Sequence, residues 1–303
     1  MRLLSRSTPS PYDEHLTYFT VSEANEFRRL VGRSFAAAGR DVDVHPDHVE
    51  DRSGTTFQLW NIGVLCIRAE PHDWAGLIEE HVRLVTTPTR DLSDLSQPEL
   101  EAGLSLRLVE TASVPDPDSL AYARVVAPGL LEVLSVDLVD SVATPLREEL
   151  AELGPIGELL ARGRDNLRAL LAHHGLRAES DDEGGLGRFT AVTGDSLYTA
   201  SLALLLQETV EHFTGEDDWG RGVLVAVPCR HRLLYRTIDT ADTAEALRRM
   251  HHDALRGFSR EAGPLSPDVY WVRGHRWAQA TSWEGGKSRL LRGTGLREAL
   301  KGL

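Results

Sequence analysis

The chain has 303 residues, 41% of them hydrophobic, which is enough to bury the core of one large domain or two medium ones. Its formal net charge of −13 argues against general nucleic-acid binding and against attachment to anionic membranes by charge alone. No apolar run approaches the ~18–20 residues that span a bilayer, and the first residues lack the apolar segment of a signal peptide. The two cysteines, Cys66 and Cys229, suit a reducing compartment, so we expect a cytoplasmic protein.

The N-terminal part of the chain is predicted to be an arm followed by a helix and short strands. Residues 1–19 contain two prolines and predict a loose arm. Thr20 or Ser22 can cap a helix that runs to Ala38, where Gly39 ends it. Three strands and a second helix are predicted to follow, at residues 42–44, 55–60, 63–67 and 74–85.

A polar connection leads to a second group of strands. Residues 86–101 are rich in Pro, Ser and Asp, which is typical of a solvated linker. Apolar runs beyond it predict three strands and two helices, at residues 104–109, 120–126, 130–136, 141–153 and 156–173.

The stretch from Gly187 to Asp239 is predicted to be the structural centre. A strand at residues 189–192 leads into a helix over residues 196–213, with Asp195 as its N-cap. This helix is apolar on more than one side, so neighbours should cover most of its circumference. An apolar hairpin follows, with strands at residues 223–227 and 233–238. Beyond it we predict a helix at 242–258, strands at 270–272 and 277–282, and a basic helix from 286 onwards.

These elements predict an α+β fold of two similar lobes, each a mixed or antiparallel sheet flanked by helices. The expected domains are an N-terminal arm, two lobes, and C-terminal strands with a basic helix, at residues 1–19, 20–153, 154–262 and 263–303. Similar plans of hairpin, Asp-x-x-Asp and helix begin at Val126 and Ala226, which suggests an internal duplication. Chance recurrence of a common junction is the alternative.

Several segments resemble the bacterial YtpQ-type family, a group without an established activity. The matching segments are residues 58–61, 133–137, 165–167, 194–201 and 225–230. His231 departs from the pattern, in which an acidic residue follows the arginine. The resemblance covers most of residues 25–240. It implies a cytoplasmic α+β protein and no particular chemistry.

The tetrapeptide from Gly194 to Leu197 spells the nucleophile block of GDSL-type esterases. In such a block a serine at a helix start uses free N–H groups to stabilise an oxyanion. The later blocks of those enzymes are missing, since no asparagine follows Asn166. We therefore expect Asp195 to be an ordinary N-cap, and a serine hydrolase that uses Ser196 with Asp195 is the alternative.

Two arginine-rich segments predict binding surfaces. The first is a basic hairpin turn suited to carboxylates or phosphates, formed by Cys229, Arg230, His231 and Arg232. An activated thiol is the weaker interpretation of its cysteine. The second combines residue types that dominate protein interfaces, and its members are Trp271, Arg273, Arg276 and Trp277. A strand that closes the core is the alternative for this segment.

No complete catalytic constellation is visible, and we expect neither a cofactor nor a metal. His45 and His48 have a ligand-like spacing but lie on a polar loop without a Cys pair or an HExxH motif. The leading prediction is a non-catalytic accessory or adaptor protein that binds another protein. Nucleic acid and membrane are not expected partners, and a homo-oligomer is compatible with the sequence.

Overall fold

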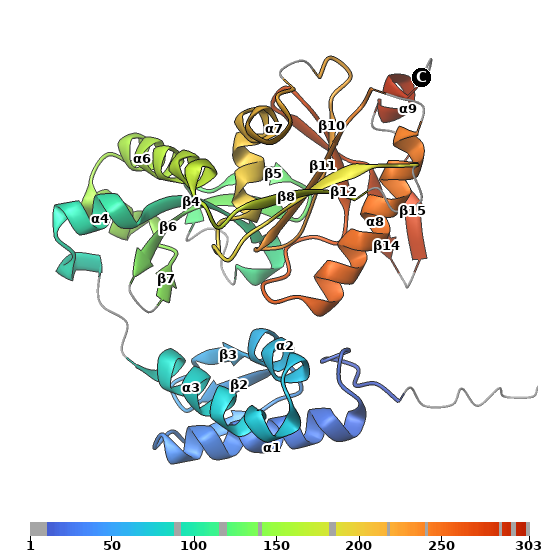
Figure 1. Ribbon diagram of the computed structural model, residues 1–303. Helices are drawn as coiled ribbons and strands as arrows, with labels where there is room; N and C mark the ends of the chain where they lie inside the picture. Colours follow the sequence, from blue (N-terminus) through green and yellow to red (C-terminus); the bar gives the residue numbers. More distant parts are fainter. Residues whose placement is uncertain are drawn as a thin grey trace, which may run out of the picture. The chain divides into compact units, whose positions relative to one another are not determined.

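The computed structural model describes residues 11–87, 92–114, 120–138, 141–181, 186–216, 219–239, 242–284, 287–291 and 295–300. It has the predicted α+β fold, built of helices and antiparallel sheets (Figure 1). Unit 1 holds the described residues of Met1–Pro88 and Ser259–Ala262, and unit 2 those of Thr89–Phe258 and Gly263–Leu303. Residues 1–10 of the predicted arm and parts of the basic tail lie outside the described residues. None of the described helices combines the length and apolarity that a bilayer crossing requires.

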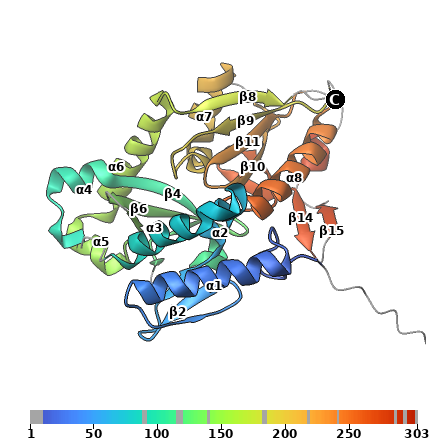
Figure 2. The same ribbon diagram turned by 60° about the horizontal axis from the view of Figure 1, so that its bottom comes forward.

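This division differs from the predicted lobes at residues 20–153 and 154–262. The strands that precede residue 153 share one hydrophobic cluster with residues as distant as Val272. The reason is that α6 (Ile156–Ala169) packs on β4 (Leu104–Glu110), so the sheet before the expected boundary is covered by the helix after it. Both views show α6 running alongside β4 (Figures 1 and 2).

Unit 1 is a three-stranded antiparallel sheet with helices around it. Its main elements are α1 (Val21–Ala37), β1 (Val42–Val44), β2 (His48–Asp51), β3 (Thr56–Gln58), α2 (Trp60–Arg68) and α3 (Trp74–Thr86). The Thr20 cap is confirmed, since the Thr20 hydroxyl accepts from the Glu23 amide at 3.3 Å. The Glu23 carboxylate accepts from the Thr20 amide at 2.8 Å, which completes a capping box.

The predicted strand at residues 63–67 is wrong, because this segment belongs to α2. Ile62 and Cys66 are buried four residues apart, while Leu65 between them is 48% exposed. That is the spacing of a helix face. A short apolar run rich in branched residues does not distinguish a buried helix from a strand.

The first sheet of unit 2 has β6 (Leu130–Leu138) at its centre. β4, β5 (Arg124–Ala127) and β7 (Ser141–Ala143) pair with it antiparallel. The helices of this part are α4 (Gln97–Gly103), α5 (Arg147–Leu153) and α6. The predicted strand at 120–126 is therefore shorter, the predicted helix at 141–153 begins as a strand, and the predicted linker contains α4.

The second sheet of unit 2 has six strands in the order β13-β12-β10-β11-β9-β8. They are β8 (Arg177–Asp181), β9 (Phe189–Thr193), β10 (Val223–Cys229), β11 (Arg232–Thr237), β12 (Val269–Arg273) and β13 (Arg276–Gln279). The predicted hairpin is β10–β11. All of β10 is buried, and the helix α8 (Thr243–Arg260) contributes Leu247 and Met250 to the cluster on one face of this sheet.

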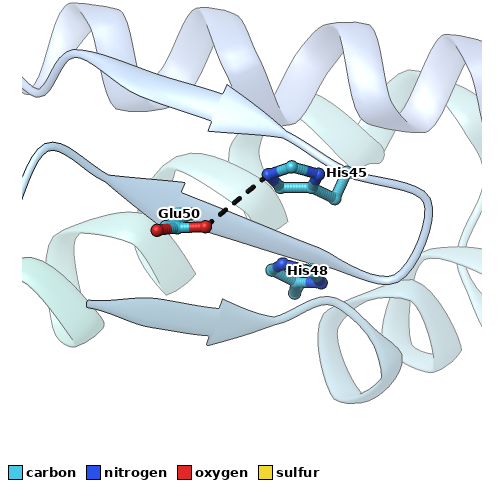
Figure 3. A group of neighbouring side chains, drawn as sticks. All are labelled: His45, His48 and Glu50. Carbon is cyan, nitrogen blue, oxygen red and sulfur yellow. Dashed lines mark ion pairs between the residues drawn. The ribbon is translucent and has the colours of Figure 1, made fainter. Parts of the chain in front are cut away.

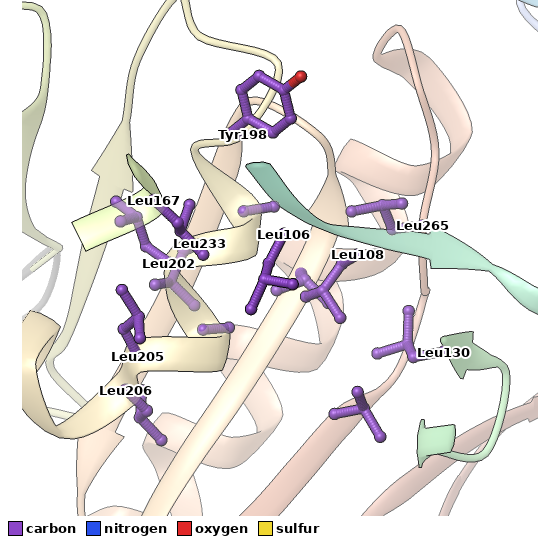
Figure 4. Packing of buried hydrophobic residues seen from close by; sticks show 14 of the residues in the cluster. Leu106, Leu108, Leu130, Leu167, Tyr198, Leu202, Leu205, Leu206, Leu233 and Leu265 are labelled. Atoms are coloured by element: carbon purple, nitrogen blue, oxygen red, sulfur yellow. The ribbon is translucent and has the colours of Figure 1, made fainter. Parts of the chain in front are cut away.

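The predicted helix over residues 196–213 is confirmed only at its end. A turn leads into a 3-10 helix, Ala200–Leu205, and only Leu206–Thr214 forms the α-helix α7. The apolar side chains of this segment are nevertheless buried against β4 and the six-stranded sheet, as expected (Figure 4). Gly215 ends α7 in the left-handed conformation, with φ of 71°.

The C-terminal part adds a small hairpin, β14 (Thr281–Glu284) with β15 (Lys287–Leu290), and the short helix α9 (Leu296–Ala299). The predicted basic helix from residue 286 is thus partly a strand. An internal duplication is not confirmed. In the first of the two similar segments β7 lies between the hairpin and the helix, and the two hairpins belong to sheets of different size and order.

Candidate functional site

A groove of about 750 Å³ lies in unit 2 beside the β12–β13 turn. This volume falls within the range of ~300–1,000 Å³ that is typical of ligand sites. The lining comes from β5, α6, the 3-10 helix with α7, the segment before β10, and the β12–β13 turn. Its residues are Arg124, Arg164, residues 203–208, Trp219, Gly220, residues 272–275 and Trp277.

The lining divides by chemistry into an apolar part and a cationic part. Its buried residues are apolar and include Leu205, Leu206 and Val272, and the half-buried Trp219 and Trp277 extend this surface. Its exposed residues include Arg124, Arg273 and His275. Such a surface can hold an apolar side chain while cations contact a negative charge beside it.

Two arginines of the groove share one buried carboxylate. The Glu132 side chain is only 8% exposed, and its Oε2 atom lies 2.6 Å from Arg124 Nη2 and 3.8 Å from Arg164 Nη2. Arg124 faces Glu132 directly across the β5–β6 pair. Two guanidinium groups around one carboxylate leave a net positive charge at this wall.

The β12–β13 turn adds a further positive charge. Arg273 and Arg276 lie directly opposite each other on the two strands, where like charges repel. Both are exposed, and no ion pair joins either of them to a carboxylate in the part of the chain that the structure describes. Only Arg273 lines the groove, so its guanidinium is available to an incoming anion.

The predicted aromatic-basic segment is therefore split. Arg273 and Trp277 line the groove, and the Trp277 ring lies 5.8 Å from the Tyr270 ring. Trp271 packs instead with the cluster on the other face of the sheet, and its indole donates to the Arg221 carbonyl at 2.9 Å. Arg276 lies outside the groove lining.

Sequence reasoning missed Arg124, Glu132, Arg164 and Trp219. One signal was present, because Glu132 is the only charged residue between Leu130 and Val136, where the other residues except Ser135 are apolar. A buried carboxylate needs a cationic partner, so this position indicates a nearby arginine. The sequence does not identify which arginine, because Arg124 and Arg164 reach Glu132 from another strand and from a helix.

The predicted basic hairpin turn is largely internal. Cys229 is completely buried, and Arg232 forms an ion pair with Asp253 at 2.6 Å. Arg230 donates from Nε to Nε2 of His231 at 2.9 Å, and His231 Nδ1 lies 3.2 Å from the Gly194 carbonyl. The turn is therefore not the exposed loop tip that the sequence suggests. Its Arg230 forms no ion pair with any carboxylate that the structure describes.

Ser196 and Asp195 lie in the turn before the 3-10 helix. The Ser196 hydroxyl accepts from the Tyr198 amide at 3.2 Å, and Asp195 is exposed. His231 is an imidazole near this turn, but both of its ring nitrogens are engaged, by Arg230 and by Gly194. None of the hydrogen bonds among the described residues connects a general base to Ser196, and Asp195 does not cap the helix as expected.

Unit 1 contains one group with metal-ligand chemistry, formed by His45, His48 and Glu50 (Figure 3). Their ligand atoms lie within 4.8 Å of one another. The two imidazoles stack with centroids 4.5 Å apart, His45 pairs with Glu50 at 3.8 Å, and His48 pairs with Asp47 at 2.8 Å. The group thus satisfies itself by stacking and ion pairs, and we assign no metal to it.

Comparisons with known proteins add no relative to this description. No protein-family model, no curated protein and no solved structure matches the chain.

Proposed function

We propose that this protein is a cytoplasmic, non-catalytic accessory protein that binds an acidic segment of another protein in the groove of unit 2. The observation that carries the proposal is the pairing of apolar walls with cations in one groove. Arg273, without a carboxylate partner among the described residues, stands beside the aromatic surface of Trp277. Trp and Arg are the residue types most often decisive in protein interfaces.

Charge distribution supports an acidic partner segment. The whole chain carries −13, yet the described lining of the groove contains three arginines and one carboxylate, Glu208. Glu208 itself pairs with Arg168. A local positive surface on an acidic protein favours an acidic segment of a partner. Such binding weakens with salt, because the exposed charges are screened.

Selection from a random peptide display library on the immobilised full chain tests the proposal. We expect the selected peptides to be acidic and to contain a large apolar residue. Arg273→Glu should weaken their binding at least about tenfold, or ~1.4 kcal/mol, because it reverses a charge at the groove. Trp277→Leu should weaken binding by removing the aromatic wall.

Arg276→Glu is the matched control, since Arg276 faces Arg273 across the strands but does not line the groove. It should change peptide affinity much less than Arg273→Glu. Selection of neutral or basic peptides would contradict the proposal. Equal losses in the two arginine variants would also contradict it, because they would indicate a non-specific charge effect.

A further inference from the structure

Arg107 is a half-buried cation that has no counter-ion among the described residues. It lies in the middle of β4, where Ser105 is the other polar residue between Leu104 and Val109, and it faces Val133 of β6. Its Nε atom is buried and has no hydrogen-bond partner among the described residues. No carboxylate of the described chain forms an ion pair with it, and burial lowers its pKa. A guanidinium removed from water in this way is unfavourable unless an anion compensates it.

Arg230 is a second guanidinium of the same kind. The stem of its side chain lies where a Cβ atom on Gly263 would be, and its Nε–H is fixed by His231. This hydrogen bond makes Nε2 of His231 the acceptor, so the imidazole carries its proton on Nδ1 and donates to the Gly194 carbonyl. Arg230 is thereby oriented by a neutral partner, and no carboxylate in the described ranges forms an ion pair with it.

Backbone contacts bring the two arginines to one place. The 3-10 helix connects β4 with the β10–β11 turn, because Leu108 N–H donates to the Ser201 hydroxyl at 3.0 Å and Ala200 N–H donates to the Arg230 carbonyl at 3.0 Å. The charge of Arg107 adds to burial in lowering the pKa of Arg230, so the two groups are electrostatically coupled.

Hydroxyl groups accompany the two cations. The Tyr198 hydroxyl lies 3.4 Å from the Ser135 hydroxyl, and the Arg107 charge acts on the Tyr198 phenol. Ser135 lies next but one to Val133, which faces Arg107, so its side chain is on the Arg107 face of the sheet. Two guanidinium forks with adjacent hydroxyls are the donor set that proteins use to hold phosphate groups.

We propose that Arg107 and Arg230 form a binding site for a small phosphate-type dianion, separate from the groove of the proposed function. Two positive charges match a dianion better than a monocarboxylate. Neither arginine lines the groove, so the test of phosphate binding is independent of the test of peptide binding.

Thermal unfolding and calorimetric titration of the full chain with inorganic phosphate test the site. Phosphate should raise the unfolding midpoint above that in sodium chloride of equal ionic strength, and sodium acetate should raise it less. In Arg107→Met the phosphate increment should disappear. In chloride this variant should be at least as stable as the wild type, because an uncompensated buried charge is replaced by an apolar side chain of similar length.

Arg107→Lys keeps the charge, and it serves if Arg107→Met does not fold. It should bind phosphate at least about tenfold more weakly, because a lysine lacks the planar fork. Arg273→Met, in the groove, should retain the full phosphate increment. Equal midpoints of the wild type in phosphate and chloride would overturn the proposal. So would an increment from acetate as large as that from phosphate, an increment that survives in both Arg107 variants, or its loss in Arg273→Met.

Discussion

The ion pair between Asp13 and Arg28 should dominate the acid sensitivity of unit 1. The Asp13 carboxylate accepts from Arg28 Nη1 at 2.9 Å and Nη2 at 2.8 Å, and it also accepts from the amides of His15 and Leu16. The hydrogen bonds from Arg28 are the main cause that lowers the pKa of Asp13 from 3.8 to about 2. Burial acts in the opposite direction, and the two amide hydrogen bonds lower the pKa further. This interval corresponds to about 2 kcal/mol of stabilisation at neutral pH.

The sign follows from the lowered pKa. The folded state holds the proton less tightly than the unfolded state, so the stabilisation is present above pH 3.8 and is lost as the pH falls toward about 2. Asp13→Asn should therefore unfold more easily than the wild type by about 2 kcal/mol at pH 7. At pH 2 the two proteins should have nearly equal free energies of unfolding.

Urea unfolding between pH 7 and pH 2, followed by tryptophan fluorescence, measures this difference. Hydrogen exchange at pH 7 should show that the loss is located in the peptides of α1, which Arg28 belongs to. Asp41→Asn is a suitable control, because the Asp41–Arg52 pair is exposed and should contribute less than about 1 kcal/mol. A difference that persists unchanged at pH 2, or that is absent at pH 7, would refute the reasoning.

Three further predictions test other parts of the structure. Gly222→Ala should destabilise unit 2 by roughly 2 kcal/mol or more in urea unfolding. The reason is that φ is 95° at Gly222 and a Cβ atom there would lie 2.5 Å from Trp271 Nε1. An unchanged unfolding midpoint would contradict this. Burial raises the pKa of Tyr122 to about 12, so the absorbance titration of this tyrosine should lie at higher pH than that of free tyrosine. The stabilisation that comes from keeping its phenol protonated is present up to pH 10 and is lost as the pH rises through 12. Burial also raises the pKa of Cys66 to about 12, so this thiol should react with a disulfide reagent at pH 8 only after unfolding; fast reaction of the native protein would argue against the packing of α2.

Local signals in the sequence predicted some elements well. Thr20 with Glu23 forms a capping box, and both partners lie within four residues, so the start of α1 could be predicted. The Leu-rich stretch before α7 is buried as expected, but its 3-10 geometry was missed. Its conformation depends on contacts with β4 and β11, and such contacts are not visible in helical periodicity.

The candidate site was less predictable because its residues converge from distant parts of the chain. Arg273 and Trp277 form a local pattern and could be proposed from composition. Arg124 and Arg164 join them only through the pairing of β5 with β6 and the packing of α6 on that sheet. Arg107 resembles any exposed strand residue in the sequence, and what distinguishes it is its buried Nε atom, which has no hydrogen-bond partner among the described residues.

The outer strand β8 has a consequence for how the protein behaves at high concentration. Among the described strands it pairs with β9 alone, so the backbone groups on its other side can accept a strand from another molecule. Arg177, Glu179 and Asp181 alternate along it, and most of the strand is exposed. A strand from another molecule would have to dehydrate these charges in order to add there. These charges therefore disfavour aggregation through the edge strand. A variant with valines at the three positions should form fibrils or precipitate more readily.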